Sequence, residues 1–235
     1  MVGYNVFDHD PRVLAWAQAA YSAAIRLDTS QRRHGGTWFV GVDALPNAPD
    51  GSVDGVPLQG PWDVDWTGWH RAQVSIVYAN YPLQDKDESD AAHRFRRNRD
   101  AAHMDGLLPE GPQKRRHLRE PHAFILGLAL NDATKSPLVV WPQSHVIMKD
   151  AFARVFANLA PEKWAEQDVT EIYQDARRDV FKTCQRVEVP LLRGQSVVLD
   201  RHLIHGVSPM VGDLPDEGRM MAYFRPQFSN VRDWL

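Results

Sequence analysis

Ala123-Phe-Ile-Leu-Gly-Leu-Ala-Leu130, followed after a short polar segment by Pro137-Leu-Val-Val-Trp141, is the stretch of sequence that decides the fold. Each run is apolar and too short for a typical helix, and turn-forming residues separate the two. Short continuous apolar runs bounded by turn signals indicate buried β-strands. The sequence therefore predicts two neighbouring strands in the core of the protein.

Further strands are expected on both sides of this pair. Gln73–Tyr81 alternates between polar and apolar residues, and shorter strand-like runs follow at 186–190, 196–199 and 219–225. Many short strands with intervening turns are typical of an antiparallel sandwich or barrel. We expect a mainly β protein, specifically a double-stranded β-helix, the jelly-roll barrel of cupin-like proteins.

Helices are expected in two places. Asp10–Leu27 has a capping Asp, a Pro in the first turn and apolar residues at helical spacing. Lys149–Thr183 forms a second helical region that divides near Pro161, whereas the Gly- and Pro-containing segment 106–120 is expected to be a loop. The sequence thus predicts one domain over residues 1–235, with a barrel core at about 73–225, an N-terminal helix and a helical insertion.

Composition excludes several classes of function. The chain has 235 residues, 43% of them hydrophobic and 24% charged, as is usual for a globular protein. A net charge of −3 without a basic, aromatic-rich patch argues against nucleic-acid binding. No apolar run approaches the roughly 20 residues that cross a bilayer. With Cys184 as its single cysteine and no signal-like N-terminus, the chain is expected in the cytoplasm.

Two separated fragments predict a metal site. His103-Met104-Asp105 carries a His and an Asp two residues apart, and on a strand such residues point to one face, about 6–7 Å apart. His205 lies far along the chain, with His202 as a nearby competitor. Two imidazoles and one carboxylate leave the remaining metal positions open. This is the ligand set of non-haem Fe(II) oxygenases.

The order of these motifs resembles the phytanoyl-CoA dioxygenase-like branch of the Fe(II)/2-oxoglutarate-dependent oxygenases. The resemblance covers about residues 73–225 and rests on four landmarks in sequence, namely His103-Met104-Asp105, Pro137-Leu-Val-Val-Trp-Pro-Gln-Ser-His145, Gly194-Gln-Ser-Val-Val-Leu-Asp200 with His205-Gly206, and Arg219. Two departures are visible. Gln143 replaces the family's Gly, and the segment between His205 and Arg219 is a few residues longer than usual.

The resemblance implies a function and a set of roles. Fe(II) would be held by His103, Asp105 and His205, and Arg219 would bind the distal carboxylate of 2-oxoglutarate. Dioxygen and 2-oxoglutarate would be consumed to oxidise a small organic substrate, with succinate and carbon dioxide as co-products. Asp105 favours hydroxylation or a related oxidation, because the halogenating relatives carry a small residue at that position.

Four other side chains are candidate pocket residues, and three of them have two possible roles. Arg225 shares a strand face with Arg219 and Tyr223, so it is the rival for the 2-oxoglutarate carboxylate or a contact for an acidic substrate. Tyr223 is a candidate substrate contact on the same face. His122 either faces the iron pocket or bonds to backbone at a strand entrance. Trp141 either walls the pocket or belongs to the core.

Two further function classes compete with the oxygenase. One is a cupin-like metalloenzyme, an isomerase or hydrolase that does not use 2-oxoglutarate; the other is a non-catalytic jelly-roll binding module. Arg219 favours the oxygenase, since only that reaction needs a cation at this position. The basic residues Arg115, Arg116 and Arg119 hint at an anionic small-molecule substrate. Substrate identity and oligomeric state are not defined by the sequence.

Overall fold

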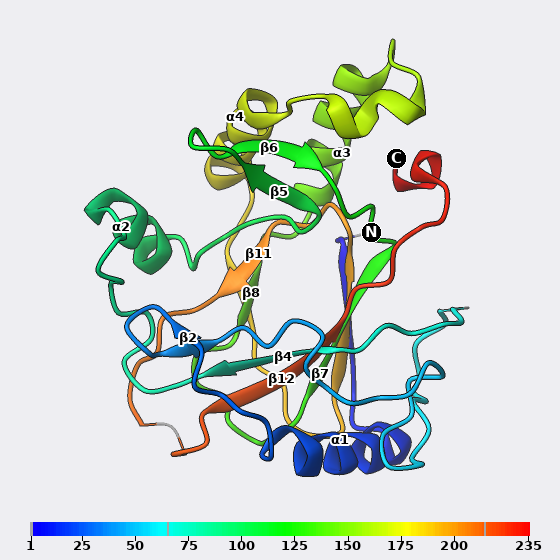
Figure 1. Ribbon diagram of the computed structural model, residues 1–235, viewed down its shortest axis with the longest axis vertical. Helices are drawn as coiled ribbons and strands as arrows, with labels where there is room; N and C mark the ends of the chain where they lie inside the picture. The colour runs from blue at the N-terminus through cyan, green and yellow to red at the C-terminus, as the bar shows by residue number, and fades with distance from the viewer. Residues whose placement is uncertain (1, 65, 214) are drawn as a thin grey trace.

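Antiparallel strands form most of the protein, in a computed structural model that describes residues 2–64, 66–213 and 215–235. A seven-stranded sheet has the order β1-β10-β7-β12-β4-β3-β2, and a three-stranded sheet has the order β11-β8-β9. Figure 1 shows this arrangement. The strands of the larger sheet are β1 (Tyr4–Phe7), β2 (Arg32–Arg33), β3 (Trp38–Phe39), β4 (Gln73–Val77), β7 (Phe124–Ala129), β10 (Ser196–Asp200) and β12 (Arg219–Phe224); those of the smaller are β8 (Leu138–Val140), β9 (Val187–Val189) and β11 (His205–Val207).

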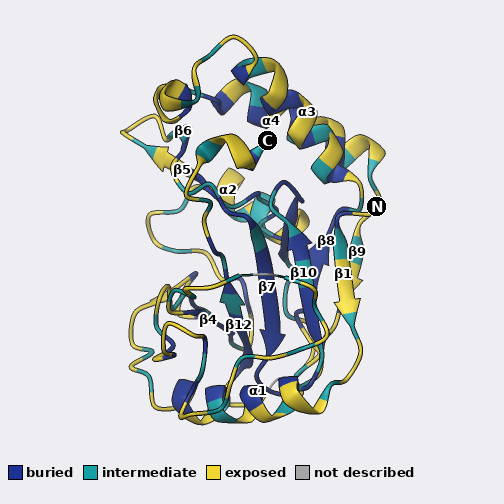
Figure 2. Cartoon of the chain, turned by 90° about the vertical axis from the view of Figure 1, so that its right-hand side faces the viewer, coloured by how far each residue is buried: buried dark blue, intermediate teal, exposed yellow. Residues whose placement is uncertain are grey.

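The two sheets pack against each other through apolar side chains. Ile125 and Val197 of the larger sheet share a buried cluster with Leu138, Val140 and Val189 of the smaller sheet. In Figure 2, β7, β8 and β10 are dark blue along most of their length, as expected for strands between two layers. The mainly β, antiparallel prediction is confirmed. The strands of these two layers form separate sheets, however, and barrel closure is not part of the observed pairing.

Helix α1 (Pro11–Ala24) covers the outer face of the larger sheet. Asp10 caps the helix by accepting a hydrogen bond from the backbone N–H of Arg12 at 2.8 Å, and Pro11 occupies the first turn. Trp16 is fully buried against the outward residues of β4, β7 and β12. The predicted N-terminal helix is therefore confirmed, and its packing leaves the opposite face of the sheet for a site.

The helical insertion lies at the other end of the molecule from α1, as both views show (Figures 1 and 2). It consists of α3 (Ser144–Phe156), the 3-10 turn η1 (Pro161–Glu166) and α4 (Thr170–Thr183), so the predicted break near Pro161 is present. A second 3-10 turn, η2 (Val231–Trp234), ends the chain. Ser144 at the start of α3 accepts a hydrogen bond from the backbone N–H of Ile204 at 2.9 Å. This bond joins the insertion to the segment that leads into β11.

Segment 106–120, predicted as a loop, is instead a hairpin of β5 (Leu107–Glu110) and β6 (Arg115–Leu118). The loop prediction is wrong because the hairpin has little apolar alternation and is supported from outside. Val169 donates a backbone hydrogen bond to Arg116, and the Thr170 hydroxyl accepts one from the Arg116 backbone. A short helix, α2 (Asp90–Asn98), precedes the hairpin. None of the helices among the described residues is long and apolar enough to span a membrane.

Candidate metal centre

His103 and His205 are joined directly by their backbones. The N–H of His103 donates to the carbonyl of His205 at 2.8 Å, and the N–H of His205 donates to the carbonyl of His103 at 2.9 Å. This pair of bonds is an isolated antiparallel bridge outside the longer ladders. It brings the two imidazole centroids to 4.7 Å from each other.

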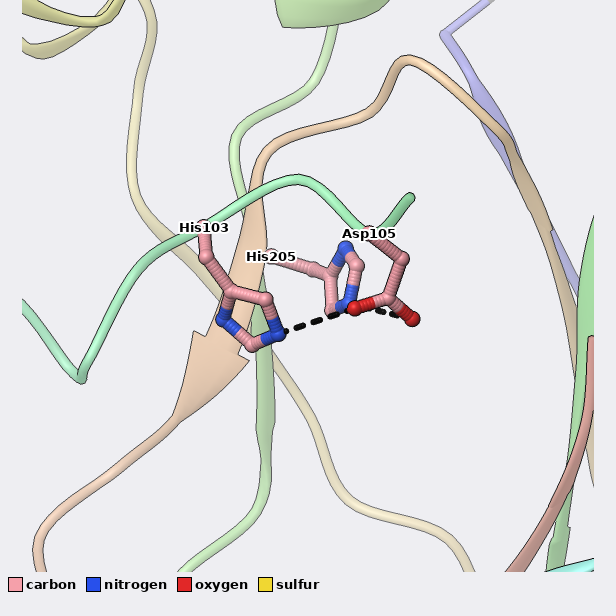
Figure 3. A group of neighbouring side chains, drawn as sticks. All are labelled: His103, Asp105 and His205. Atoms are coloured by element: carbon pink, nitrogen blue, oxygen red, sulfur yellow. Dashed lines mark ion pairs between the residues drawn. The ribbon is translucent and has the colours of Figure 1, made fainter. Parts of the chain in front are cut away.

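Asp105 completes a cluster with the two histidines (Figure 3). One carboxylate oxygen lies 3.1 Å from Nε2 of His103, and the other lies 3.9 Å from Nε2 of His205. One donor atom from each residue falls within 4.8 Å of the others. The sequence argument placed His103 and Asp105 on one strand, whereas Asp105 begins a turn that continues through Gly106 at φ 87°. Met104 between them is buried on the opposite side, so the expected alternation holds.

Backbone carbonyls orient both imidazole rings. Nδ1 of His103 lies 3.0 Å from the carbonyl of Ala101, and Nδ1 of His205 lies 3.0 Å from the carbonyl of Leu203. A carbonyl can only accept, so each Nδ1 carries a proton, which leaves Nε2 as the nitrogen of each ring that would bind a metal. Anchoring of the second ring nitrogen in this way is usual for metal-binding histidines. The three residues therefore fit a divalent cation that accepts two imidazoles and one carboxylate.

The protonation states also suit a metal. Burial, assisted by the nearby charge of His103, lowers the pKa of His205 to about 4. Burial opposes ionisation of Asp105, but the hydrogen bond with His103 and the charges of His205, His103 and Arg225 outweigh it and hold its pKa well below the usual range. At neutral pH, His205 is thus neutral and Asp105 is ionised. These are the forms that bind a metal without first releasing a proton.

Gly206 makes the close approach of the two histidine segments possible. A Cβ atom at this position would lie 2.1 Å from the carbonyl oxygen of Asp100. That carbonyl accepts a hydrogen bond from the N–H of Val207 at 2.9 Å, and the buried Asp100 carboxylate accepts two from Arg186, just before β9, each at 2.8 Å. The glycine that follows His205 is therefore required by contact with the backbone that leads to His103.

An inner cavity of about 160 Å³ lies between the sheets beside the metal cluster. Val40, Ile125, Leu138, Leu199 and Val207 make most of its wall apolar. The polar lining comes from Trp38, Gln73, Ser75, His103, Asp105, His205, Tyr223 and Arg225. The predicted pocket contacts Tyr223 and Arg225 thus lie beside the three candidate ligands.

Two of the lining residues, Gln73 and Ser75, were not singled out by sequence reasoning. Trp38 also lines the cavity and donates from Nε1 to the Ser75 hydroxyl at 2.9 Å. Gln73 and Ser75 project from the same face of β4. The signal was present in the sequence, because two polar residues alternate with apolar ones on an otherwise buried strand.

Arg219 and Arg225 occupy different environments. Arg225 lies at the metal cluster, with one terminal nitrogen 3.5 Å from a carboxylate oxygen of Asp105. Arg219 lies at the other end of β12 on the same face, and its side chain is 3% exposed. Neither terminal nitrogen of Arg219 has a hydrogen-bond partner among the described residues. A buried guanidinium without an anion is costly, so this position fits an anionic group from outside the chain.

The other residues considered for the site lie in three different places. His122 is buried, with Nδ1 3.0 Å from the carbonyl of Arg225 and Nε2 3.2 Å from the Glu120 carboxylate, and it lines a second, outer cavity. Trp141 packs edge-on against Phe181 in the core beneath α3 and α4 and lines neither cavity. His202 lies between Phe152 and Trp234 and is not part of the metal cluster.

The basic residues that hinted at an anionic substrate are engaged elsewhere. Arg115 is paired with Asp168 and Glu171, and Arg119 is paired with Glu110. Arg116 donates to the carbonyl of Leu107 at 2.8 Å. None of the three lines the inner or the outer cavity, so the hint has no basis in the structure.

Comparisons with known proteins gave matches among solved structures alone. No family model matches the chain. No curated protein matches it either. The 2-oxoglutarate-dependent epimerase SnoN from nogalamycin biosynthesis is 18% identical over 53% of this chain and 37% of its own, with a TM-score of 0.29. EctD from S. alaskensis, with 2-oxoglutarate and 5-hydroxyectoine, is 15% identical over 94% of this chain and 71% of its own, with a TM-score of 0.42. The non-heme iron oxygenase OrfP, as a D157A mutant with (3S)-hydroxy-L-Arg, is 14% identical over 53% and 49%, with a TM-score of 0.33. The chain thus spans little more than a third of the length of SnoN.

Replacing Gly206 by Ala should weaken metal binding. The added Cβ would push the His205 strand away from the Asp100 carbonyl and separate the two imidazoles. We expect a loss of about 10- to 100-fold in Fe(II) affinity, the usual effect of disturbing residues that support metal ligands. Anaerobic calorimetric titration measures it. Gly55→Ala is the matched control, because its φ of 79° strains the backbone while a Cβ there meets nothing; Fe(II) affinity as high in Gly206→Ala as in this control would contradict the role.

A buried histidine behind the cavity wall should make stability depend on pH. The His34 ring stacks on Trp38 at an interplanar angle of 8°, and burial, followed by the charge of Arg96, lowers the pKa of His34 to about 4. Between about pH 6.5 and 4 the unfolded chain binds a proton that folded His34 does not, so this residue's contribution to stability is lost as pH falls.

His34→Phe should remove this contribution while keeping the stacking. In urea unfolding from pH 7.5 to 4, the free energy of unfolding should fall less steeply in the variant, by up to about 1.4 kcal/mol per pH unit. Equal slopes for the two proteins would show that His34 does not titrate in this way.

Proposed function

We propose that this chain is a non-haem Fe(II)- and 2-oxoglutarate-dependent dioxygenase that hydroxylates or otherwise oxidises a small organic substrate. The observation that carries the proposal is the convergence of two carbonyl-anchored imidazoles and one carboxylate on a cavity whose strand face also bears the unpaired Arg219. The proposal takes residues 1–235 as one domain of jelly-roll type.

The three candidate ligands would each contribute one group to metal binding. His103 and His205 would each offer Nε2, and Asp105 would contribute a negative charge from a neighbouring turn. All three line the inner cavity, so a metal held by them would be accessible from it. Iron bound there would supply the oxidising chemistry, with 2-oxoglutarate and dioxygen consumed and succinate and carbon dioxide released. The small residue of the halogenating relatives is absent, so Asp105 supports oxygenation.

Arg219 suits the distal carboxylate of 2-oxoglutarate better than Arg225 does. Its guanidinium is buried, its two terminal nitrogens have no hydrogen-bond partner among the described residues, and a planar fork of donors matches a carboxylate. Arg225 already approaches Asp105 at 3.5 Å, which places it beside the metal cluster and not at the far end of a bound cosubstrate. A metalloenzyme that worked without 2-oxoglutarate would have no evident anion for Arg219. This contrast favours the oxygenase over the isomerase or hydrolase alternative.

The cavity walls supply the remaining requirement, which is exclusion of bulk water. Ile125, Leu138 and Leu199 give an apolar lining, and Trp38 is fixed by its bond to Ser75. Apolar surroundings lower the local dielectric constant, which would strengthen the interaction of the buried Arg219 with a carboxylate.

Anaerobic addition of Fe(II) and 2-oxoglutarate to metal-free protein tests the proposal. Chelation of the iron by 2-oxoglutarate should produce a weak visible charge-transfer band, and His103→Ala should abolish it. Arg219→Ala should keep the band but raise the dissociation constant for 2-oxoglutarate about tenfold or more, because a charged hydrogen-bonding pair is lost. Exposed Arg232→Ala is the matched control. No band in the wild type would refute the proposal, and weakening by Arg225→Ala in place of Arg219→Ala would reverse the two arginines.

A further inference from the structure

The outer cavity leads from the surface to the metal cluster. It has a volume of about 440 Å³, within the range of small-molecule sites, and it shares Val42 and Arg225 with the inner cavity. Arg225 therefore lies at the junction, with its guanidinium beside Asp105 on the inner side. A molecule that reached the iron by this route would pass Arg225.

Two histidines fix the backbone of Arg225. His70 accepts the Arg225 N–H on Nε2 at 3.2 Å, and Nδ1 of His122 lies 3.0 Å from the Arg225 carbonyl. Because Nε2 of His70 accepts a bond, that nitrogen carries no proton and the ring is neutral. Nε of Arg225 is buried and has no partner among the described residues. The junction thus holds a positioned cation with unused hydrogen-bonding capacity.

Negative charge lies further out in the same cavity. Glu120 contacts His122 through one oxygen at 3.2 Å, and its side chain is 35% exposed. Asp43 is exposed in the loop after β3, with a left-handed φ of 51° that Asp tolerates better than most residues. Trp66 adds an aromatic surface, since its ring packs edge-on against Phe124 and Phe228 and also lines the cavity. Carboxylates next to an indole are a common environment for an ammonium group.

We propose that the outer cavity binds a small zwitterionic substrate, with its carboxylate toward Arg225 and its protonated amine toward Glu120 and Asp43. The inference rests on the proposed function, for which it names the class of substrate. The carboxylate of such a molecule would meet the positive charge of Arg225 at the junction, and its amine would meet the negative charges of Glu120 and Asp43 further out. Electrostatic complementarity of this kind sets orientation as well as choice of ligand.

Other classes of substrate fit less well. A simple anion would meet Arg225 but would also approach Glu120 and Asp43 without a compensating charge. An apolar chain would remove water from Arg225, Glu120 and Asp43 and return no hydrogen bonds, which is unfavourable. A zwitterion provides an opposite charge for the residues at each end of the cavity.

Matched probes that differ only in charge test the inference. The protein loaded with Fe(II) and 2-oxoglutarate without oxygen is titrated calorimetrically with 4-aminobutyrate, butyrate and butylamine, and then with 6-aminohexanoate, hexanoate and hexylamine. We expect the better zwitterion to bind about tenfold or more tightly than its acid and its amine, because each end forms a charge-assisted contact. Zwitterions that bind no more tightly than their singly charged counterparts would overturn the inference.

Charge-neutral variants locate the amine end. Glu120→Gln keeps the shape that contacts His122 and should reduce the preference for the zwitterion over the acid about tenfold, while affinity for the acid does not fall. Asp43→Asn tests the same end on an exposed loop and does not depend on that contact. Glu162→Gln, an exposed carboxylate outside both cavities, is the matched control. An unchanged preference in both Glu120→Gln and Asp43→Asn would refute the assignment.

The charge-transfer band distinguishes failure of the oxygenase proposal from failure of the substrate class. If the band forms but the zwitterion preference is missing, the oxygenase proposal stands and the substrate class is wrong. If the band does not form, the oxygenase proposal fails, and with it the substrate class that depends on it.

Discussion

The reciprocal pair of backbone hydrogen bonds between His103 and His205 is the contact on which the rest of the site depends. It joins two segments that are about a hundred residues apart in the chain and belong to no common sheet. A backbone bridge fixes the side chains of its two residues on one side more tightly than packing alone would. Asp105 then needs only a short turn to reach both rings. The same contact requires Gly206, because no side chain fits between that strand and the Asp100 carbonyl.

The surrounding fold divides its tasks between two faces of one sheet. Outward residues of β4, β7 and β12 pack on α1, and inward residues of the same strands line the cavity or carry the arginines. Because side chains alternate along a strand, the same strand contributes one face to the packed core and the other face to the candidate site. Arg219, Met221, Tyr223 and, just beyond the strand, Arg225 form one such inward row, which places a cation near each end of the site.

Local patterns made much of this predictable. The capped start of α1, the break at Pro161 and the apolar run of β7 are each encoded within about a dozen residues. The grouping of the candidate ligands was predicted from the order of the motifs, although the geometry differs from a plain strand, because a turn at Asp105 and a single bridge at His103 replace it. Gln73 and Ser75 could have been found from the alternation of β4.

Other features depend on neighbours that are distant in sequence. The β5–β6 hairpin has charged, half-exposed strands, and its contacts with the start of α4 cannot be read from residues 106–120. Arg115 and Arg119 appeared free in the sequence because their partners Asp168, Glu171 and Glu110 come together only after folding. Trp141 is core and not cavity wall because α3 and α4 cover it. Charged and aromatic side chains are thus hard to assign to a site from the sequence, because their partners in the folded protein are not known.

The bridge between His103 and His205 has a thermodynamic consequence. Two hydrogen bonds and the Asp100–Arg186 pair are a modest tether for the segment that carries two of the three candidate ligands. A divalent ion bound to all three residues would add a cross-link between that segment and β11, which exists only in the folded chain. Metal occupancy and the local free energy of opening are therefore linked, and each tenfold excess of metal over its dissociation constant would stabilise the closed segment by about 1.4 kcal/mol. The bound ion would therefore stabilise the folded site as well as take part in the reaction.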